Sequence, residues 1–268
     1  MASGAKFCGW PGRGAVSLGA VDILAGDVRL SAYLARPAEG ASHPGQLLVL
    51  CHGFPSGPLG APATGQTYPQ LAARVASEAG WSVLCFNFRG TGGSEGDFSL
   101  FGWLADLHAV IGHALASEGV EAVWLAGFST GGSLAICAAG EDERVRGVAA
   151  FAAPASFEPW AKDASGFLER ARQLGVVKDP AFPPDFGAWA RQLGELRPLS
   201  LVGKVPPRPL LLVHGTEDEV VDPADARALA AEAGEGAELR MLAGAGHRLR
   251  HDPRALAVLV GWLERQRP

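Results

Sequence analysis

Short apolar runs alternate with helical patterns along this chain of 268 residues, and this alternation constrains the fold more than any other feature. Five runs have the length of a strand and almost continuous hydrophobicity, at residues 47–51, 82–88, 122–126, 145–151 and 210–213. Such runs are typical of parallel strands that are covered on both faces. Helical patterns lie at residues 68–79, 103–117, 131–139, 223–233 and 253–265. The alternation predicts an α/β protein with a mostly parallel central sheet and helices on both faces.

Two segments depart from this alternation. Residues 20–36 have the pattern of two strands around Gly26 and Asp27, which predicts an antiparallel hairpin. Residues 154–207 show no strand pattern but contain helical stretches at 167–174 and 186–196. A connection of this length with helices of its own predicts a helical lid insertion. We therefore expect an α/β core domain at 1–153 and 208–268, interrupted by a lid at 154–207.

Charge and cysteine usage narrow the class of function. The formal charge is −5 and no run of Lys or Arg forms a basic arm, so we expect no nucleic-acid partner. The four cysteines, Cys8, Cys51, Cys85 and Cys137, form no close pair and are expected to be free thiols, which favours a reducing compartment and the cytoplasm by default. We also expect no signal peptide and no membrane segment, because no long apolar stretch is free of charged or turn residues.

A serine between two glycines carries the strongest local signal. Gly127, Ser129 and Gly131 form a Gly-x-Ser-x-Gly pattern between an apolar run and an Ala-rich helical pattern. On such a turn the serine hydroxyl is exposed, and the glycines avoid clashes where the strand turns into the helix. The helix also directs the positive end of its dipole towards a developing anion. The alternative is an ordinary glycine-rich turn.

A nucleophilic serine needs a base and a group that orients the base. Asp218 lies in the loop after the run at 210–213, and His247 lies in a glycine-rich loop before the last helix. The order Ser129, Asp218, His247 is the order of one class of catalytic triads. Asp222 lies in the same acidic loop, but its place before a proline is better explained as a helix cap.

On these motifs, the sequence resembles serine hydrolases of the α/β-hydrolase superfamily over nearly its whole length. Two further stretches match, Cys51-His52-Gly53-Phe54 and residues 87–94. A looser similarity extends to uncharacterised bacterial members related to dienelactone hydrolases and acylaminoacyl peptidases. The resemblance implies an α/β-hydrolase fold and a hydrolase that uses neither a metal nor a cofactor. His247 and His251 have the spacing of a helical metal pair, but Gly246 and Pro253 bracket them, so we expect no metal site there.

The resemblance also implies roles for individual residues. Ser129 is expected to be the nucleophile, His247 the general base and Asp218 the carboxylate that orients the imidazole. The backbone N–H groups of Phe54 and Thr130 are expected to form the oxyanion hole. His52 and His214 each precede a glycine and are expected to be structural. The candidates for contact with the substrate are aromatic: Phe54, Phe157, Trp160, Phe186 and Trp189. For each aromatic residue of the insertion, packing within the lid is the alternative.

The expected function is hydrolysis of a small-molecule carboxylic ester through an acyl-enzyme. An amidase, a peptidase or a thioesterase is the alternative among enzymes, because the same triad cleaves those bonds. The alternative from another class is a binding protein that keeps the fold without turnover. The sequence leaves the acyl and alcohol groups, the oligomeric state and any lid movement open.

Overall fold

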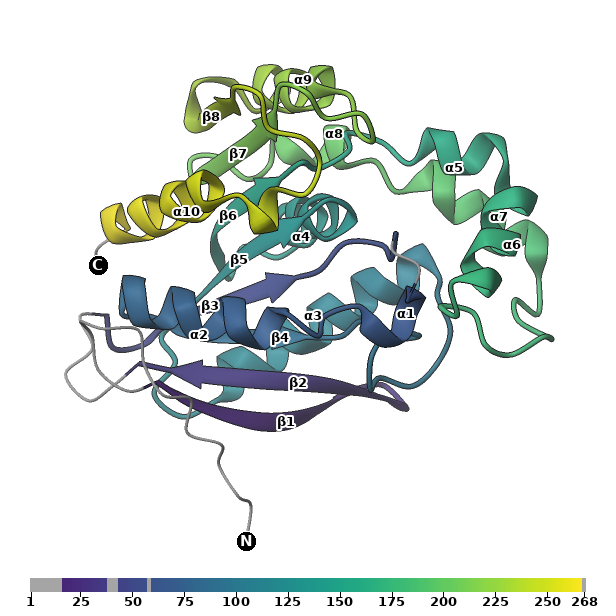
Figure 1. Ribbon diagram of the computed structural model, residues 1–268, viewed down its shortest axis with the longest axis horizontal. Helices are drawn as coiled ribbons and strands as arrows, with labels where there is room; N and C mark the ends of the chain where they lie inside the picture. Colours follow the sequence, from purple (N-terminus) through teal and green to yellow (C-terminus); the bar gives the residue numbers. More distant parts are fainter. Residues whose placement is uncertain (1–15, 38–42, 57–58, 267–268) are drawn as a thin grey trace, which may run out of the picture.

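The computed structural model describes residues 16–37, 43–56 and 59–266 and is built around one sheet of eight strands (Figure 1). The strand order is β1-β2-β4-β3-β5-β6-β7-β8. The strands are β1 (Ser17–Ala25), β2 (Val28–Arg36), β3 (Gln46–Cys51), β4 (Ser82–Phe86), β5 (Ala122–Phe128), β6 (Val145–Phe151), β7 (Leu210–Gly215) and β8 (Ala237–Leu242). β1 and β2 form an antiparallel hairpin, and β2 also pairs antiparallel with β4, whereas the pairs from β4 to β8 are parallel. The predicted hairpin and mostly parallel sheet are confirmed.

The sequence analysis missed one strand, β8. Its residues are mostly half-buried rather than buried, because β8 lies at the edge of the sheet and pairs only with β7. An edge strand does not need the continuous apolar run that identified the central strands. Because Glu238 and Arg240 interrupt its apolar residues, β8 could not be recognised as a strand from the sequence.

Helices cover both faces of the sheet, as predicted. The helices on one face are α2 (Tyr68–Ala79) and α10 (Pro253–Arg265), and those on the other are α3 (Leu100–Ala116), α4 (Thr130–Glu141) and α9 (Pro223–Ala233). α2, α9 and α10 begin and end where the sequence predicted. α3 begins three residues earlier than predicted, because the Ser99 hydroxyl accepts a hydrogen bond from the Gly102 N–H at 3.0 Å and caps the helix.

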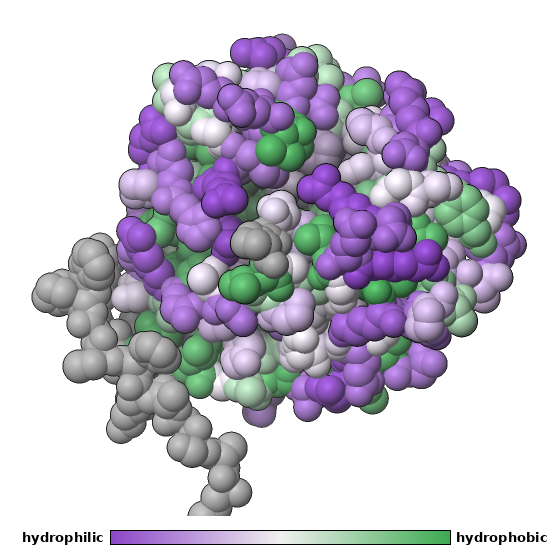
Figure 2. Space-filling model, turned by 45° about the vertical axis from the view of Figure 1, so that its right-hand side comes forward, coloured by the Kyte–Doolittle hydropathy of each residue, from purple (hydrophilic) through white to green (hydrophobic). Residues whose placement is uncertain are grey.

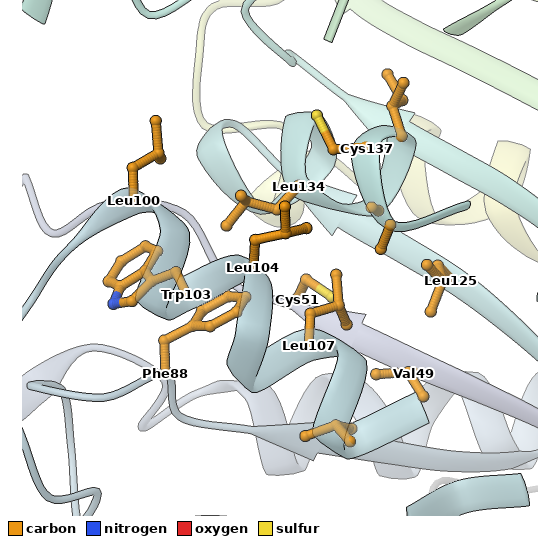
Figure 3. Close-up of a cluster of buried hydrophobic side chains, with 14 of the residues drawn as sticks. Val49, Cys51, Phe88, Leu100, Trp103, Leu104, Leu107, Leu125, Leu134 and Cys137 are labelled. Carbon is orange, nitrogen blue, oxygen red and sulfur yellow. The ribbon is translucent and has the colours of Figure 1, made fainter. Parts of the chain in front are cut away.

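The strands bury side chains on both faces, which explains their continuous hydrophobicity. In β3, Val49 and Cys51 belong to the cluster beneath α3 and α4, whereas Leu48 and Leu50 belong to the cluster on the opposite face. Figure 3 shows the first cluster, where Leu107 of α3 lies near the strand residues. Because helices cover both faces of the sheet, functional groups are expected on the loops that follow the carboxyl ends of the strands.

The described cysteines are buried free thiols. Cys51, Cys85 and Cys137 have no disulfide partner, as expected, and burial raises the pKa of each thiol well above its ordinary value. Cys8 lies outside the described residues.

Four helices lie between β6 and β7, where the sequence predicted an insertion. They are α5 (Glu158–Lys162), α6 (Ala164–Gln173), α7 (Phe186–Glu195) and α8 (Pro198–Val202). α6 and α7 correspond to the two predicted stretches, whereas α5 and α8 have five residues each and are too short for a recognisable helical period. In Figure 1, α5, α6 and α7 lie together beside the sheet.

The insertion is joined to the core by packing and by backbone hydrogen bonds. Buried residues of α6 and α7 belong to the same hydrophobic cluster as those of α3 and α4. The Ala61 N–H, in the short helix α1 (Gly60–Ala63), donates to the Leu174 carbonyl at 2.7 Å, and the Phe98 N–H donates to the Val176 carbonyl at 2.9 Å. On the face that Figure 2 shows, hydrophilic residues surround scattered hydrophobic ones, as on an ordinary solvent-facing surface. Within the described ranges, no helix is both long and apolar enough to span a bilayer.

Candidate active site

Ser129 occupies the strained turn between β5 and α4. Its backbone has φ 53° and ψ −126°, a conformation that residues other than glycine rarely adopt. The Ser129 N–H donates to the Phe151 carbonyl at 2.7 Å, which helps to hold the turn against β6. The strain therefore lies at the residue that the sequence predicted to be the nucleophile.

Both flanking glycines are required by close backbone contacts. A Cβ on Gly127 would lie 2.2 Å from the Gly131 carbonyl oxygen, and a Cβ on Gly131 would lie 2.4 Å from the His52 carbonyl oxygen. Neither backbone atom can move aside as a flexible side chain could. The Gly-x-Ser-x-Gly pattern is therefore a steric condition for this turn.

Three side chains from separate loops meet at this turn. Ser129 Oγ lies 3.1 Å from His247 Nε2, and His247 Nδ1 lies 2.9 Å from Asp218 Oδ2. Asp218 follows β7 and His247 follows β8, and the two loops are tied by the Glu217 N–H, which donates to the Ala245 carbonyl at 2.9 Å. The structure thus brings the three predicted residues into one hydrogen-bonded chain.

The Asp218 carboxylate is buried and fully hydrogen-bonded. Oδ1 accepts from the Val220 and Val221 N–H groups, each at 2.9 Å, and Oδ2 accepts from His247 Nδ1 and His214 Nε2 at 2.9 and 3.1 Å. Burial alone would raise the pKa of Asp218, but these hydrogen bonds outweigh it and hold the pKa well below its usual range. The group is therefore an anion next to His247.

His214 contributes a contact that the sequence analysis did not foresee. Its ring is completely buried, and Nε2 lies 3.1 Å from both Asp218 Oδ2 and the Val221 carbonyl oxygen. Because both of these atoms are acceptors, Nε2 must carry the hydrogen. His214 is thus structural, as expected, but its contact is with the carboxylate of the candidate triad. The spacing of four residues between His214 and Asp218 was the available signal.

Asp222 has the role that its proline neighbour indicated. It is the N-cap residue of α9, and its Oδ1 accepts from the Ala224 N–H at 2.8 Å. Its side chain makes no contact with His247 among the hydrogen bonds of the described residues. The two acids therefore have different contacts: Asp218 is hydrogen-bonded to His247, whereas Asp222 caps α9.

The loop after β3 lies against Ser129. A Cβ on Gly53 would lie 3.0 Å from the Ser129 Cβ, so the next residue, Phe54, is close to the serine, and both line one cavity. Thr130, the first residue of α4, lines the same cavity. Phe54 and Thr130 thus both lie near Ser129, and Thr130 begins α4, whose N-terminal end carries the positive end of the helix dipole.

His52 stabilises the loop after β3 by hydrogen bonds of its ring. It is buried, its Nδ1 donates to the Gly53 carbonyl at 2.8 Å, and its Nε2 accepts from the Phe88 N–H at 3.1 Å. These partners require a neutral ring. Burial lowers the pKa of His52 to about 4, which agrees with that requirement.

A cavity of about 990 Å³ opens between Ser129 and the insertion. Its apolar wall includes Phe54, Phe157, Trp160 and Phe167. The Trp160 and Phe167 rings stack with centroids 4.2 Å apart, and the Phe54 ring lies 5.2 Å from Trp160 and 5.1 Å from Phe167. Phe54, Phe157 and Trp160 were expected to contact substrate, and Phe167 is a further aromatic residue of the insertion that lines the cavity.

The expectation that Phe186 and Trp189 line the site is corrected by their placement. Neither is among the residues that line the cavities at Ser129. Trp189 is buried and donates from Nε1 to the Phe98 carbonyl at 3.1 Å, whereas Phe186 is 42% exposed and stacks on Trp189. Trp189 therefore joins the insertion to the core, which was the alternative for these aromatic residues.

No three or more His, Cys, Asp or Glu side chains of the described ranges are arranged so that they could hold a metal ion. His251 ends the short 3-10 turn η2 (Leu249–His251), whereas His247 faces Ser129 and Asp218. The arrangement at Ser129 is a hydrogen-bonded chain of a serine, a histidine and a carboxylate.

Comparison with known proteins identifies the family. The profile of the alpha/beta hydrolase family matches residues 48–259, which include Ser129, Asp218 and His247. The chain belongs to this family. A search of curated proteins finds no match.

Solved structures share the fold over most of the chain. Est1E from Butyrivibrio proteoclasticus is similar at 23% identity and a TM-score of 0.68, with 92% of this chain and 96% of that chain covered. An esterase from Pyrococcus furiosus, Pf2001, is similar at 18% identity and a TM-score of 0.67, with 92% of each chain covered. XC6422 from Xanthomonas campestris, a serine hydrolase without a lid, is similar at 24% identity and a TM-score of 0.61, with 92% of each chain covered. At these identities the likeness establishes the fold.

Proposed function

We propose that this α/β hydrolase cleaves carboxylic esters of small molecules through an acyl-enzyme formed on Ser129. The observation that carries the proposal is the hydrogen-bonded chain from Ser129 Oγ through His247 to Asp218, at the edge of a cavity of about 990 Å³. A nucleophile, its base and an orienting anion in this order are the requirements of acyl transfer.

The first half of the reaction forms the acyl-enzyme. Ser129 Oγ attacks the ester carbonyl carbon while His247 Nε2 accepts the hydroxyl proton, and the carbonyl oxygen becomes an oxyanion beside the Phe54 and Thr130 N–H groups. One such donor contributes about 3 kcal/mol to transition-state stabilisation in a serine protease. The C–O bond to the alcohol then breaks, and His247 Nε2 transfers its proton to the departing oxygen.

The second half repeats these steps with water. His247 accepts a proton as the water oxygen attacks the acyl carbon, and the proton returns to Ser129 Oγ when the acid leaves. In both halves the imidazole becomes positively charged next to Asp218, whose low pKa keeps the carboxylate ionised. That anion stabilises the imidazolium and holds the Nδ1–H tautomer.

Several observations support an ester substrate of modest size. Est1E, which shares the fold, has been solved with ferulic acid bound, and Pf2001 is an esterase. Cavities of roughly 300–1,000 Å³ accommodate small organic ligands. We propose that helices α5 and α6 act as a lid wall, since Phe157, Trp160 and Phe167 turn an aromatic surface towards the site. A cytoplasmic location is also proposed, on the basis of the buried unpaired thiols.

The experiment is an activity screen with 4-nitrophenyl esters of increasing acyl length, followed at 405 nm. Wild-type protein should hydrolyse members of the series, and Ser129→Ala should remove turnover while the circular dichroism spectrum stays unchanged. Amide and thioester analogues with the best acyl group then rank the three bond types. Equal rates for wild type and Ser129→Ala would overturn the proposal, and an absence of hydrolysis by the wild type would favour a binding protein.

A further inference from the structure

A second cavity reaches Ser129 and His247 from the other side of the Phe54 loop. It has a volume of about 310 Å³ and lies between this loop, α2 and the turn that follows His247. Ser129, His247 and Phe54 line both cavities, so a substrate whose carbonyl carbon lies at Ser129 can extend into each.

The turn after His247 gives this second cavity a positive wall. Arg248 and Arg250 line it, and its described lining contains no Asp or Glu. We call this cavity the basic pocket. The larger cavity differs, because its lining mixes Lys162 and Arg170 with several carboxylates, Asp222 and Asp225 among them.

The Arg250 guanidinium has neutral neighbours. Nη1 donates to the Thr67 hydroxyl, and the guanidinium carbon lies 5.5 Å from the centre of the Tyr68 ring. Some other arginines of the described chain pair with carboxylates, for example Arg144 with Asp142 and Arg254 with Asp252. No ion pair to Arg250 occurs among the described residues, so its charge is not neutralised within the pocket.

The field of these arginines reaches neighbouring groups. The pKa of His251 is lowered by burial and, in addition, by the charges of Arg250 and Arg248. Arg250 also adds to the lowering of the His52 pKa, which burial dominates. A positive potential in the pocket disfavours further cations and favours an anion.

Arg248 is less specific to this pocket than Arg250. It lines the larger cavity as well, and it also lines a third cavity of about 370 Å³ that contains Glu217 and Glu219. Part of its charge therefore faces carboxylates. Arg250, in contrast, lines the basic pocket but neither of the other two cavities.

We propose that the basic pocket binds a carboxylate group of the ester substrate, so that the preferred substrates are esters with a free carboxylate at one end. This inference rests on the proposed esterase function. A planar guanidinium matches a carboxylate through paired N–H···O bonds, and the small volume suits a short acidic group. The aromatic wall of the larger cavity is left for the apolar end of the substrate.

The carboxylate can belong to the acyl group or to the alcohol, and two matched pairs of esters distinguish these sources. The acyl pair is the 4-nitrophenyl monoester of glutaric acid and 4-nitrophenyl butyrate. The alcohol pair is 4-acetoxybenzoate and 4-acetoxybenzamide. For each pair, the quantity measured is the ratio of kcat/KM for the acidic ester to that for the neutral ester, because a change in overall activity cancels in this ratio.

The test compares wild type with Arg250→Gln, Arg250→Lys and the control Arg227→Gln. Arg227 is exposed on α9, outside the lining of the three cavities described above, and its substitution changes the net charge equally. We expect Arg250→Gln to lower the ratio about three- to tenfold in one pair, as for loss of a partly exposed charged hydrogen bond. Arg250→Lys should restore part of the loss, and Arg227→Gln should leave the ratio at the wild-type value.

The outcomes separate this inference from the proposed function. Ratios that are the same in wild type and Arg250→Gln for both pairs would overturn the carboxylate site, even if the neutral esters are hydrolysed normally. A fall of the same size in Arg227→Gln would also overturn it, since that result reflects net charge. Failure of wild type to hydrolyse any of the four esters would instead contradict the proposed function.

Discussion

Removal of the His214 ring nitrogens tests how the Asp218 carboxylate is held. In His214→Phe, Asp218 keeps three of its hydrogen bonds, those from Val220, Val221 and His247, and loses the 3.1 Å contact with Nε2. The Val221 carbonyl oxygen also loses its His214 partner. His214 Nδ1 has no hydrogen-bond partner, so the phenyl ring gives up no interaction at that position.

The size of the effect follows from the charge of the acceptor. A hydrogen bond to a charged group contributes about 1.5–3 kcal/mol, so we expect the free energy of unfolding to fall by roughly 2 kcal/mol at pH 7. Loss of this bond also raises the folded-state pKa of Asp218 towards its unfolded value. A low folded pKa stabilises the protein above the unfolded pKa, near pH 4, and this stabilisation is lost only as the pH falls through the folded pKa. The full difference between wild type and variant should therefore be present at pH 7.

The assay is urea denaturation followed by tryptophan fluorescence at pH 7. His214→Gln is the matched control, because its amide nitrogen can take the place of Nε2 and donate to Asp218. We expect this variant to recover most of the lost stability at pH 7, and kcat/KM for a 4-nitrophenyl ester to fall by about tenfold or less in His214→Phe. An equal loss of stability in the two variants would refute the role assigned to His214.

Three further predictions concern other residues. Asp218→Asn should lower kcat by about 10⁴-fold, as in a serine protease, and should also lower stability, because its amide NH2 would face the ring N–H groups of His214 and His247. Asp222→Ala should lower stability by about 1 kcal/mol and leave most activity, and kinetics in which Asp222→Ala is the inactive variant would exchange the two roles. Ser129→Ala, His247→Ala and the double variant should have similar residual rates, since the residues act as one unit, and strictly multiplicative losses would contradict this. As the pH falls from 7 to 5, the buried His52 should lower the unfolding free energy by about 2 kcal/mol. The reason is that the His52 side chain binds a proton in the unfolded chain but not in the folded protein, where its pKa is about 4. Urea titrations in which His52→Gln shows the same pH dependence as wild type would rule this out.

The parts of the fold that the sequence predicted well have strong local signals. α9 and α10 were placed to the residue, because each follows an aspartate and a proline that define the first turn. The strained turn at Ser129 was also predictable, since its glycines are required by contacts within a short stretch of chain. β8 had no such signal, because an edge strand need not be continuously apolar.

The parts that could not be predicted depend on contacts between distant segments. The contact of His214 with the acid requires the loop after β7 to turn back onto its own strand. Trp189 was expected to face the substrate but points inward to the Phe98 carbonyl, a partner 91 residues away. Which aromatic residues of the insertion line the cavity also depends on such contacts, as for Phe167, whose ring lies 5.1 Å from that of Phe54. Helical spacing identifies which residues share a face of a helix, but it does not identify the segment against which that face packs.

The central claim is that Ser129 is a nucleophile activated by His247. The most direct measurement is intact-protein and peptide mass spectrometry after reaction with a fluorophosphonate probe. We expect one probe to be added, on the peptide that contains Ser129, with no labelling of Ser129→Ala and much slower labelling of His247→Ala. Labelling of Ser129→Ala at the wild-type rate, or no labelling of the wild-type protein, would contradict the account.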